Sequence, residues 1–154
     1  SHGGNEEIMG IVARELRVRA GMLVAKTGWT RFPPPAGLVS EDERRLGIHG
    51  GDVETSLMLH FRPELVDMSR AQDFVSVAAQ NERDFKYLRP TGTHAYAWIA
   101  SDLNPHGAVG NAANATAERG RLIAEAEVAG MLELLEEVVR VGLPSGPTSL
   151  PVGA

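Results

Sequence analysis

The chain has 154 residues, of which 43% are apolar, 23% charged and 5% aromatic, and its formal net charge is −5. That length suits one domain with a single core, and an acidic balance gives no electrostatic reason to expect nucleic acid or an anionic membrane as a partner. The absence of cysteine excludes disulfides, thiolate metal sites and cysteine nucleophiles. No apolar run approaches the roughly 20 residues of a membrane span, so we expect a cytoplasmic protein without a membrane segment.

The first elements of the chain are predicted as a helix followed by a strand. Apolar residues recur at helical spacing between Asn5 and Ala20, which predicts a helix with Asn5 as its N-cap. Gly21 suits the position after the helix, where a left-handed backbone is common. The short apolar run Met22–Lys26 predicts a buried strand, and the prolines at 33–35 predict an extended loop.

The middle of the chain is predicted as two short helices around a glycine loop. Ser40 and Glu43 stand at capping-box spacing, which predicts a helix ending near Gly47. A second helix, capped by Asp52 or a neighbouring residue, should end at Pro63. Residues 63–87 give no clear pattern.

The last third of the chain contains the longest predicted helix. Residues 95–100 predict a strand, residues 102–114 a loop, and residues 116–141 an amphipathic helix. We assign residues 1–141 to one domain and expect residues 142–154, rich in proline, glycine and serine, to form a flexible tail. The mixture of strands and helices favours an α/β layered sandwich.

Two glycine loops carry the residues best suited to chemistry. Residues 2–5 read His-Gly-Gly-Asn and residues 49–52 read His-Gly-Gly-Asp, and each loop leads into a predicted helix. Glycine lets backbone approach a ligand closely, and a histidine at such a position can bind a metal or transfer a proton. The alternative for either loop is an ordinary turn in which the histidine has only a local structural role.

Three segments resemble hallmark segments of the creatininase (creatinine amidohydrolase) family. The first is the loop of residues 2–5, and the second is residues 49–56, which continue His-Gly-Gly-Asp into Val-Glu-Thr-Ser. The third combines residues 106–110 with the Ala-Thr-x-x-x-Gly stretch of residues 115–120. The resemblance identifies the chain as the C-terminal portion of such a domain, starting at the His-Gly-Gly-Asn motif.

This resemblance implies a three-layer α/β sandwich with a mostly parallel sheet, of which this chain supplies the C-terminal part. It also implies a metal-dependent amidohydrolase that hydrolyses a C–N amide bond with metal-activated water. The complete site would hold two divalent ions (zinc, manganese or iron by member). The family's proteins are often hexamers, so we expect a homo-oligomer.

The resemblance assigns roles residue by residue. His2 matches a metal-binding histidine, and Glu54 matches a position expected to supply a carboxylate ligand. His49 matches the histidine that handles the proton during amide opening. Trp29 lies where the family carries an aromatic that closes over the substrate, and Gly3 lets the backbone approach that substrate. For Trp29, a plain core position is an equal alternative.

The chain departs from the family pattern in its ligand set. The family's Glu-x-His pair and a later aspartate precede the first glycine loop, and this chain contains no Glu-x-His. Since catalytic zinc needs about three protein ligands, a missing N-terminal segment or a companion chain should supply the rest. The second tryptophan of creatininases is also absent before His49, so a small-molecule amide other than creatinine is expected. Members that act on formylated pyrimidine intermediates or trim a peptide precursor are open alternatives.

Other interpretations remain open. Ser1 could act as an N-terminal nucleophile with its own amino group as base. The chain could also be a non-catalytic half that contributes packing to an oligomer. Asp52 is expected to be a helix cap rather than a metal ligand. His60 and His94 are expected at the surface or at the edge of the core, and His106 lies in a loop without an assigned role.

Overall fold

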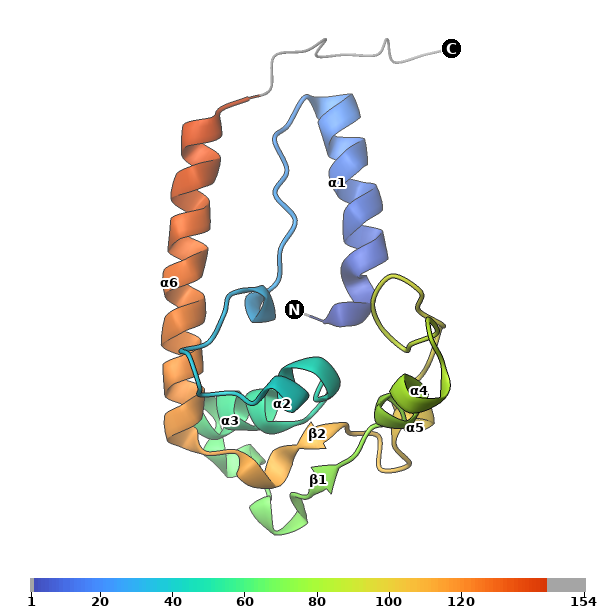
Figure 1. Ribbon diagram of the computed structural model, residues 1–154. Helices are drawn as coiled ribbons and strands as arrows, with labels where there is room; N and C mark the ends of the chain where they lie inside the picture. Colours follow the sequence, from blue (N-terminus) through green and yellow to red (C-terminus); the bar gives the residue numbers. More distant parts are fainter. Residues whose placement is uncertain (1, 144–154) are drawn as a thin grey trace. The chain divides into compact units, whose positions relative to one another are not determined.

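A computed structural model of the chain describes residues 2–143 (Figure 1). The chain forms two compact units. The terminal unit joins the residues up to Pro33 with those from Ala126 onward, and the central unit comprises Pro34–Glu125. Ser1, and with it the proposed nucleophile, lies outside the described residues, as does the expected tail from residue 144 onward.

The terminal unit begins with the helix predicted from the sequence. A 3-10 turn, η1 (Gly3–Asn5), leads into helix α1 (Glu6–Ala20), and Gly21 follows with the expected left-handed backbone at φ 65°. Asn5 occupies the predicted N-cap position, but its side chain makes no capping hydrogen bond. A histidine caps the preceding turn instead, as described below.

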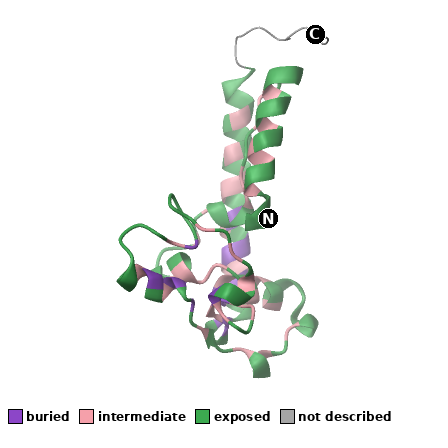
Figure 2. Cartoon of the chain, turned by 90° about the vertical axis from the view of Figure 1, so that its right-hand side faces the viewer, coloured by how far each residue is buried: buried purple, intermediate pink, exposed green. Residues whose placement is uncertain are grey.

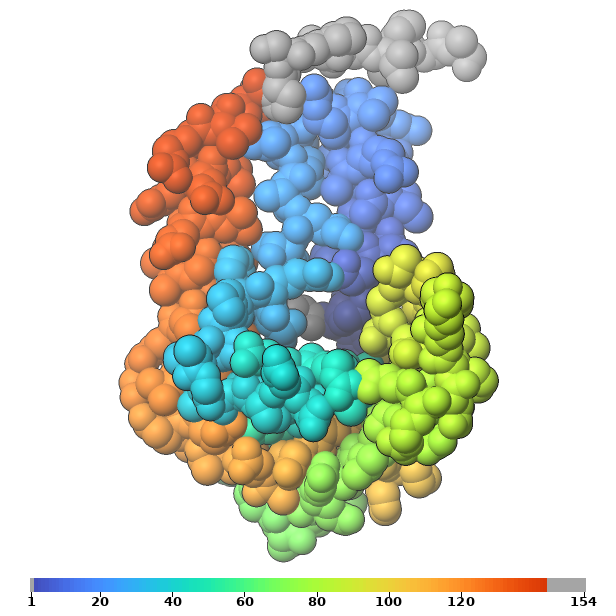
Figure 3. Space-filling view, viewed as in Figure 1, coloured from blue at the N-terminus to red at the C-terminus, as the bar shows by residue number. Residues whose placement is uncertain are grey.

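The strand predicted at Met22–Lys26 is wrong. This segment is extended, but no backbone hydrogen bond links it to a neighbouring strand within residues 2–143. It lies between α1 and the later turns of helix α6 (Ala117–Val141), as Figures 1 and 3 show. An ion pair of 2.9 Å joins Lys26 to Glu6, and Phe32 packs against Gly130 after the 3-10 turn η2 (Trp29–Arg31).

The central unit contains both predicted short helices, and their ends agree with the sequence. Helix α2 (Glu41–Leu46) begins after Ser40, whose Oγ accepts a hydrogen bond of 3.1 Å from the backbone N–H of Glu43. Helix α3 (Asp52–Phe61) ends before Pro63. The elements that follow are η3 (Pro63–Leu65), η4 (Met68–Arg70), β1 (Asp73–Phe74), α4 (Ala78–Asp84), α5 (Ala100–Leu103), β2 (Gly110–Asn111) and η5 (Ala112–Asn114).

Regular strand structure in the described part of the chain is limited to β1 and β2. They pair antiparallel, with Asp73 opposite Asn111 and Phe74 opposite Gly110. The strand predicted over residues 95–100 is wrong: Ala95 makes a single bridge to Arg89, and α5 begins at Ala100. The mostly parallel sheet of a three-layer sandwich therefore stays a prediction.

The core lies in the central unit. Its buried apolar residues come from the segment before α2, from α4, α5 and α6, and from the segments around β2, namely Val39, Ala78, Leu103, Val109, Ala112, Ala115, Ile123 and Ala124. Helix α1 has no buried residue, and Figure 2 shows exposed and half-buried residues along it. Among residues 2–143, no helix is both long and apolar enough to cross a bilayer.

Candidate functional site

His49 lies in the loop between α2 and α3, with its backbone fixed and its side chain exposed. Its N–H donates to the carbonyl of Val109 at 3.3 Å, and its carbonyl accepts from the N–H of Val109 at 2.7 Å. These paired bonds form an antiparallel bridge just before β2. Because Val109 is fully buried, the bridge anchors the loop to the core. The exposed imidazole is thus held at a defined place on the surface of the central unit.

Glu54, in the first turn of α3, hydrogen-bonds to the same loop. Its Oε2 accepts a hydrogen bond of 2.6 Å from the backbone N–H of Gly50, and the Thr55 hydroxyl donates to the Gly50 carbonyl at 3.2 Å. The structure therefore brings Glu54 and the residue after His49 together. A carboxylate in the first turn of a helix is also favoured by the helix dipole. Glu54 thus has a local structural role in addition to the predicted metal role, which stays a prediction.

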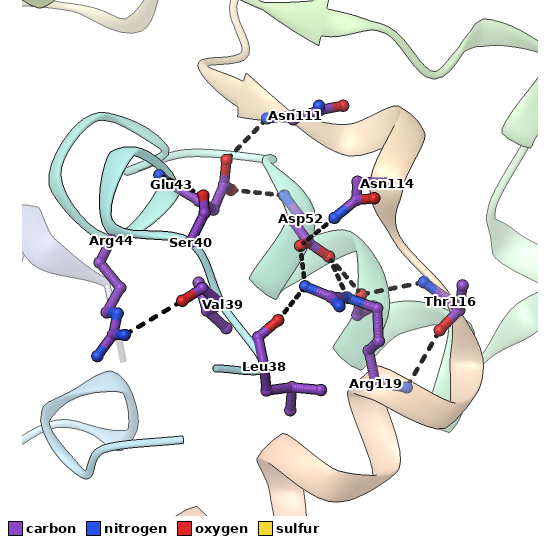
Figure 4. Close-up of polar contacts among 11 residues, drawn as sticks. Leu38, Val39, Ser40, Glu43, Arg44, Asp52, Asn111, Asn114, Thr116 and Arg119 are labelled. Carbon is purple, nitrogen blue, oxygen red and sulfur yellow. Dashed lines mark hydrogen bonds and ion pairs between the residues drawn. The ribbon is translucent and has the colours of Figure 1, made fainter. Parts of the chain in front are cut away.

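The Glu43 carboxylate also stabilises this loop. Sequence patterns did not point to this role of Glu43. Its Oε1 accepts from the N–H of Asp52 at 2.6 Å, and its Oε2 accepts from the N–H of Asn111 at 2.8 Å (Figure 4). Glu43 is 6% exposed. Burial, as the largest effect, raises the pKa of this carboxyl group, and the two backbone N–H donors oppose the shift. One buried side chain therefore links α2, the start of α3 and β2.

The expectation that Asp52 caps α3 is wrong. Gly51 occupies the N-cap position, and Asp52 is the first helical residue, 1% exposed. Its carboxylate accepts hydrogen bonds from the Ser56 hydroxyl at 3.0 Å, from the Asn114 amide at 3.0 Å and from the Arg119 guanidinium (Figure 4). The Asp52–Arg119 ion pair ties the start of α6 to α3. The sequence carries no spacing signal for this pair, because 67 positions separate its members.

His2 and Gly3 lie at the start of the terminal unit, and both are exposed. His2 Nδ1 accepts a hydrogen bond of 2.9 Å from the backbone N–H of Gly4 and so caps η1. A neutral imidazole that accepts at Nδ1 carries its proton on Nε2. Binding a metal through Nε2 would require the proton to move and the bond to Gly4 to break. His2 therefore acts as a cap in this conformation, and its ligand role stays a prediction.

Trp29 begins η2 with 44% of its surface exposed. This exposure argues against a plain core position and leaves the predicted role over the substrate as a hypothesis. The remaining histidines lie as expected outside the core: His60 and His94 are exposed and contact the rings of Phe61 and Tyr87. His106 is exposed too.

The family model for Creatininase (creatinine amidohydrolase) matches residues 1–135. The chain belongs to the creatininase family. The resemblance seen in the sequence is thereby confirmed over these residues.

Solved structures of this family are similar to the chain. A candidate creatinine amidohydrolase from Bacteroides fragilis NCTC 9343 is 27% identical, with a TM-score of 0.62 over 90% of this chain and 51% of that one. A creatininase with a tryptophan-to-phenylalanine substitution is 27% identical, with a TM-score of 0.54 over 84% and 48%. A glutamate-to-glutamine creatininase complexed with creatine is 25% identical, with a TM-score of 0.54 over 84% and 49%. No match was found among curated proteins.

The chain spans about half the length of these solved structures. Its fold is therefore creatininase-like in the part that aligns. Within residues 2–143 no group of three or more His, Asp or Glu side chains could hold a metal ion. The two predicted ligands are chemically suitable, since neutral imidazole and carboxylate both bind divalent ions. His2 belongs to the terminal unit and Glu54 to the central unit, so whether they share one ion stays a prediction.

Proposed function

We propose that the chain is part of a metal-dependent amidohydrolase that cleaves a non-peptide or cyclic C–N amide bond in a small molecule. The observation that carries the proposal is the family match over residues 1–135. That match includes both glycine loops. The anchored backbone of the second loop supports the proposal, because a proton donor works only when it is held in place.

In this proposal His49 protonates the leaving nitrogen. An amine is a poor leaving group unless it is protonated, and an imidazole can supply that proton near neutral pH. The side chain is exposed while both backbone polar groups are bonded to Val109. His49 can therefore reach a substrate without disturbing the bridge that positions it. The glycines after it let the loop pack closely against Ala108 and Gly110.

His2 and Glu54 would supply two of the ligands of a divalent metal. The chemistry that such an ion supplies is Lewis-acid activation of water. His2 would first have to give up its bond to Gly4, whereas Glu54 holds Gly50 through one carboxylate oxygen. The further ligands would come from a segment or a companion chain beyond these residues. The same proposal includes a second divalent ion at the complete site and a homo-oligomeric assembly. Zinc, manganese and iron are the candidate metals.

The decisive experiment replaces His49 in the full-length protein. His49→Gln keeps a hydrogen-bonding side chain but removes the titratable group. We expect turnover to fall by roughly a hundredfold or more with unchanged metal content. The parent enzyme should lose activity on the basic side of its pH profile, where the imidazolium is lost. The matched control is His94→Gln, another exposed histidine, which should leave turnover unchanged. Unchanged turnover in His49→Gln at saturating metal would refute the donor role.

A second candidate function is that of a non-catalytic, oligomer-forming half. The absence of a three-residue ligand cluster within residues 2–143 favours it. Calorimetric titration of the 154-residue chain with zinc or manganese addresses the ligand count. Two ligands leave an ion mostly hydrated, so we expect weak binding by this chain. Tight stoichiometric binding would mean that the chain holds a metal without further ligands.

The substrate class is tested separately with the full-length protein. Cyclic amides, formylated pyrimidine derivatives and short peptides represent the branches of the family that the sequence leaves open. Turnover of a cyclic or formylated amide supports the proposal. Turnover of peptides alone would instead support the peptide-trimming alternative.

A further inference from the structure

Glu43 occupies the position of a capping-box glutamate but does not act as one. Ser40 provides the first half of the box by accepting from the N–H of Glu43. In a complete box the glutamate would reach back to the N–H of Ser40. The Glu43 side chain instead turns into the unit, where its two oxygens accept from the backbone N–H groups of Asp52 and Asn111 (Figure 4).

The space around the Glu43 carboxylate is formed by glycines from two separate segments. A Cβ atom built on Gly47, Gly51 or Gly110 would come closer than 3.0 Å to this carboxyl group. Gly110 also has a φ of 122°, a conformation that side chains disfavour. Two glycines flank the His49 loop and the third begins β2. These segments approach each other closely enough to enclose the carboxylate, and any side chain would obstruct that approach.

The enclosed carboxylate lies beside the bridge that holds His49. Val109, the partner of His49 in the bridge, is two residues before Asn111, whose N–H binds Glu43 Oε2. Asp52, three residues after His49, binds Oε1. Glu43 thus binds both backbone segments that form the bridge between His49 and Val109. Oε1 binds the segment that contains Asp52, and Oε2 binds the segment that contains Asn111.

We propose that Glu43 is a positioning residue for His49. The hydrogen bonds that its two carboxylate oxygens accept from the N–H groups of Asp52 and Asn111 set the loop geometry that places the imidazole. The catalytic meaning of this proposal rests on the donor role proposed for His49. The geometric claim does not, and it can be tested on the 154-residue chain. The two backbone donors bind different oxygens, and a carboxylate provides two acceptor oxygens whereas a carboxamide provides one.

The first test needs no substitution. In the isotopically labelled 154-residue chain, nuclear magnetic resonance should detect scalar couplings across the hydrogen bonds from the amides of Asp52 and Asn111 to the Glu43 side-chain carbonyl carbon. Detection of both couplings supports this pair of hydrogen bonds. Absence of both, with backbone couplings of α3 detected in the same spectrum, would overturn it.

The second test compares Glu43→Gln with Glu41→Gln, an exposed glutamate of the same helix. In Glu43→Gln we expect amide hydrogen exchange at Asp52 or Asn111 to accelerate roughly tenfold or more, because one of two charge-assisted bonds is lost. The His49 ring signals should move, while those of His94 stay in place. Glu41→Gln should change neither. Unmoved His49 signals in a folded Glu43→Gln chain would overturn the proposal, and an unfolded variant leaves the coupling measurement to decide.

The third test separates this proposal from the proposed function. In the full-length protein Glu43→Gln should lower kcat with little change in KM or metal content. It should add little further loss in a His49→Gln background, since both changes act through the same imidazole. If the full-length protein has no hydrolase activity, the proposed function fails while the two magnetic resonance tests still decide the positioning. If kcat is unchanged although His49 moves, the catalytic part of the positioning proposal is wrong.

Discussion

Replacing Asp52 with asparagine should strongly destabilise the central unit. The Asp52 carboxylate accepts hydrogen bonds from Ser56, Asn114 and Arg119 and is 1% exposed. Asp52→Asn preserves the shape of the side chain but removes its charge. It also places an amide N–H₂ group where an acceptor is required, so that one of the donors loses its partner.

The expected magnitude follows from the burial of the ion pair. The Arg119 side chain is 22% exposed and its partner 2%, so the guanidinium has little water to replace the lost carboxylate. Removing one member of a buried pair costs about 3–5 kcal/mol. Because asparagine keeps one acceptor oxygen, we expect the lower end, about 3 kcal/mol. With a urea dependence of about 1–3 kcal/mol per molar, the midpoint should fall by roughly 1–3 M.

Urea unfolding of the 154-residue chain, followed by circular dichroism, measures this change. Asp42→Asn is the matched control, because Asp42 pairs with Arg45 on the exposed surface of α2, and its midpoint should stay nearly unchanged. In a double-mutant cycle, Arg119→Met in the Asp52→Asn background should cost less than in the parent by at least about 1 kcal/mol. Equal shifts for Asp52→Asn and Asp42→Asn, or additive losses in the cycle, would refute the assigned network.

Three further predictions address other parts of the chain. Glu127 is 2% exposed, its Oε2 lacks a hydrogen-bond partner within the described residues, and burial raises its pKa; Glu127→Gln should therefore stabilise the protein by about 1 kcal/mol at pH 7. A raised carboxyl pKa favours the folded state at acid pH and loses that contribution as the pH rises through the folded-state pKa. The stability at pH 4.5 minus that at pH 7 should therefore be larger for the parent than for Glu127→Gln, and the reverse order would contradict the assignment. A Cβ on Gly120 would overlap the backbone carbonyl of Ser56, whereas one on Gly3 meets nothing within 4 Å. Gly120→Ala should therefore lower the free energy of unfolding by about 1–3 kcal/mol, and Gly3→Ala should leave it almost unchanged. Equal thermal midpoints for the two variants would show that the packing at Gly120 is wrong. Removing the cap in Ser40→Ala should cost about 1 kcal/mol in urea unfolding, and no measurable loss would mean that the bond to the N–H of Glu43 contributes nothing.

Local sequence patterns predicted α1, α2, α3 and α6, because helical hydrogen bonds and caps join near neighbours, but they did not predict α4 or α5. The apolar spacing before Gly21 predicted α1, and the spacing of Ser40 and Glu43 predicted the start of α2. The strands at Met22–Lys26 and residues 95–100 were wrong for a complementary reason. A strand exists only where another segment pairs with it. Within residues 2–143, Met22–Lys26 has no such partner and residues 95–100 have only the single bridge between Ala95 and Arg89.

The same distinction between local patterns and distant partners applies to the candidate site. The sequence alone determined the two glycine loops, their histidines and the family to which the chain belongs, since those features are short and contiguous. Only the tertiary structure decided that Glu43 turns inward to hold Asp52 and Asn111, and that Asp52 pairs with Arg119 instead of capping α3. These contacts join residues 9 to 68 positions apart. Because burial removes competing water from such groups, their partners are set by how the segments pack, which local spacing does not encode.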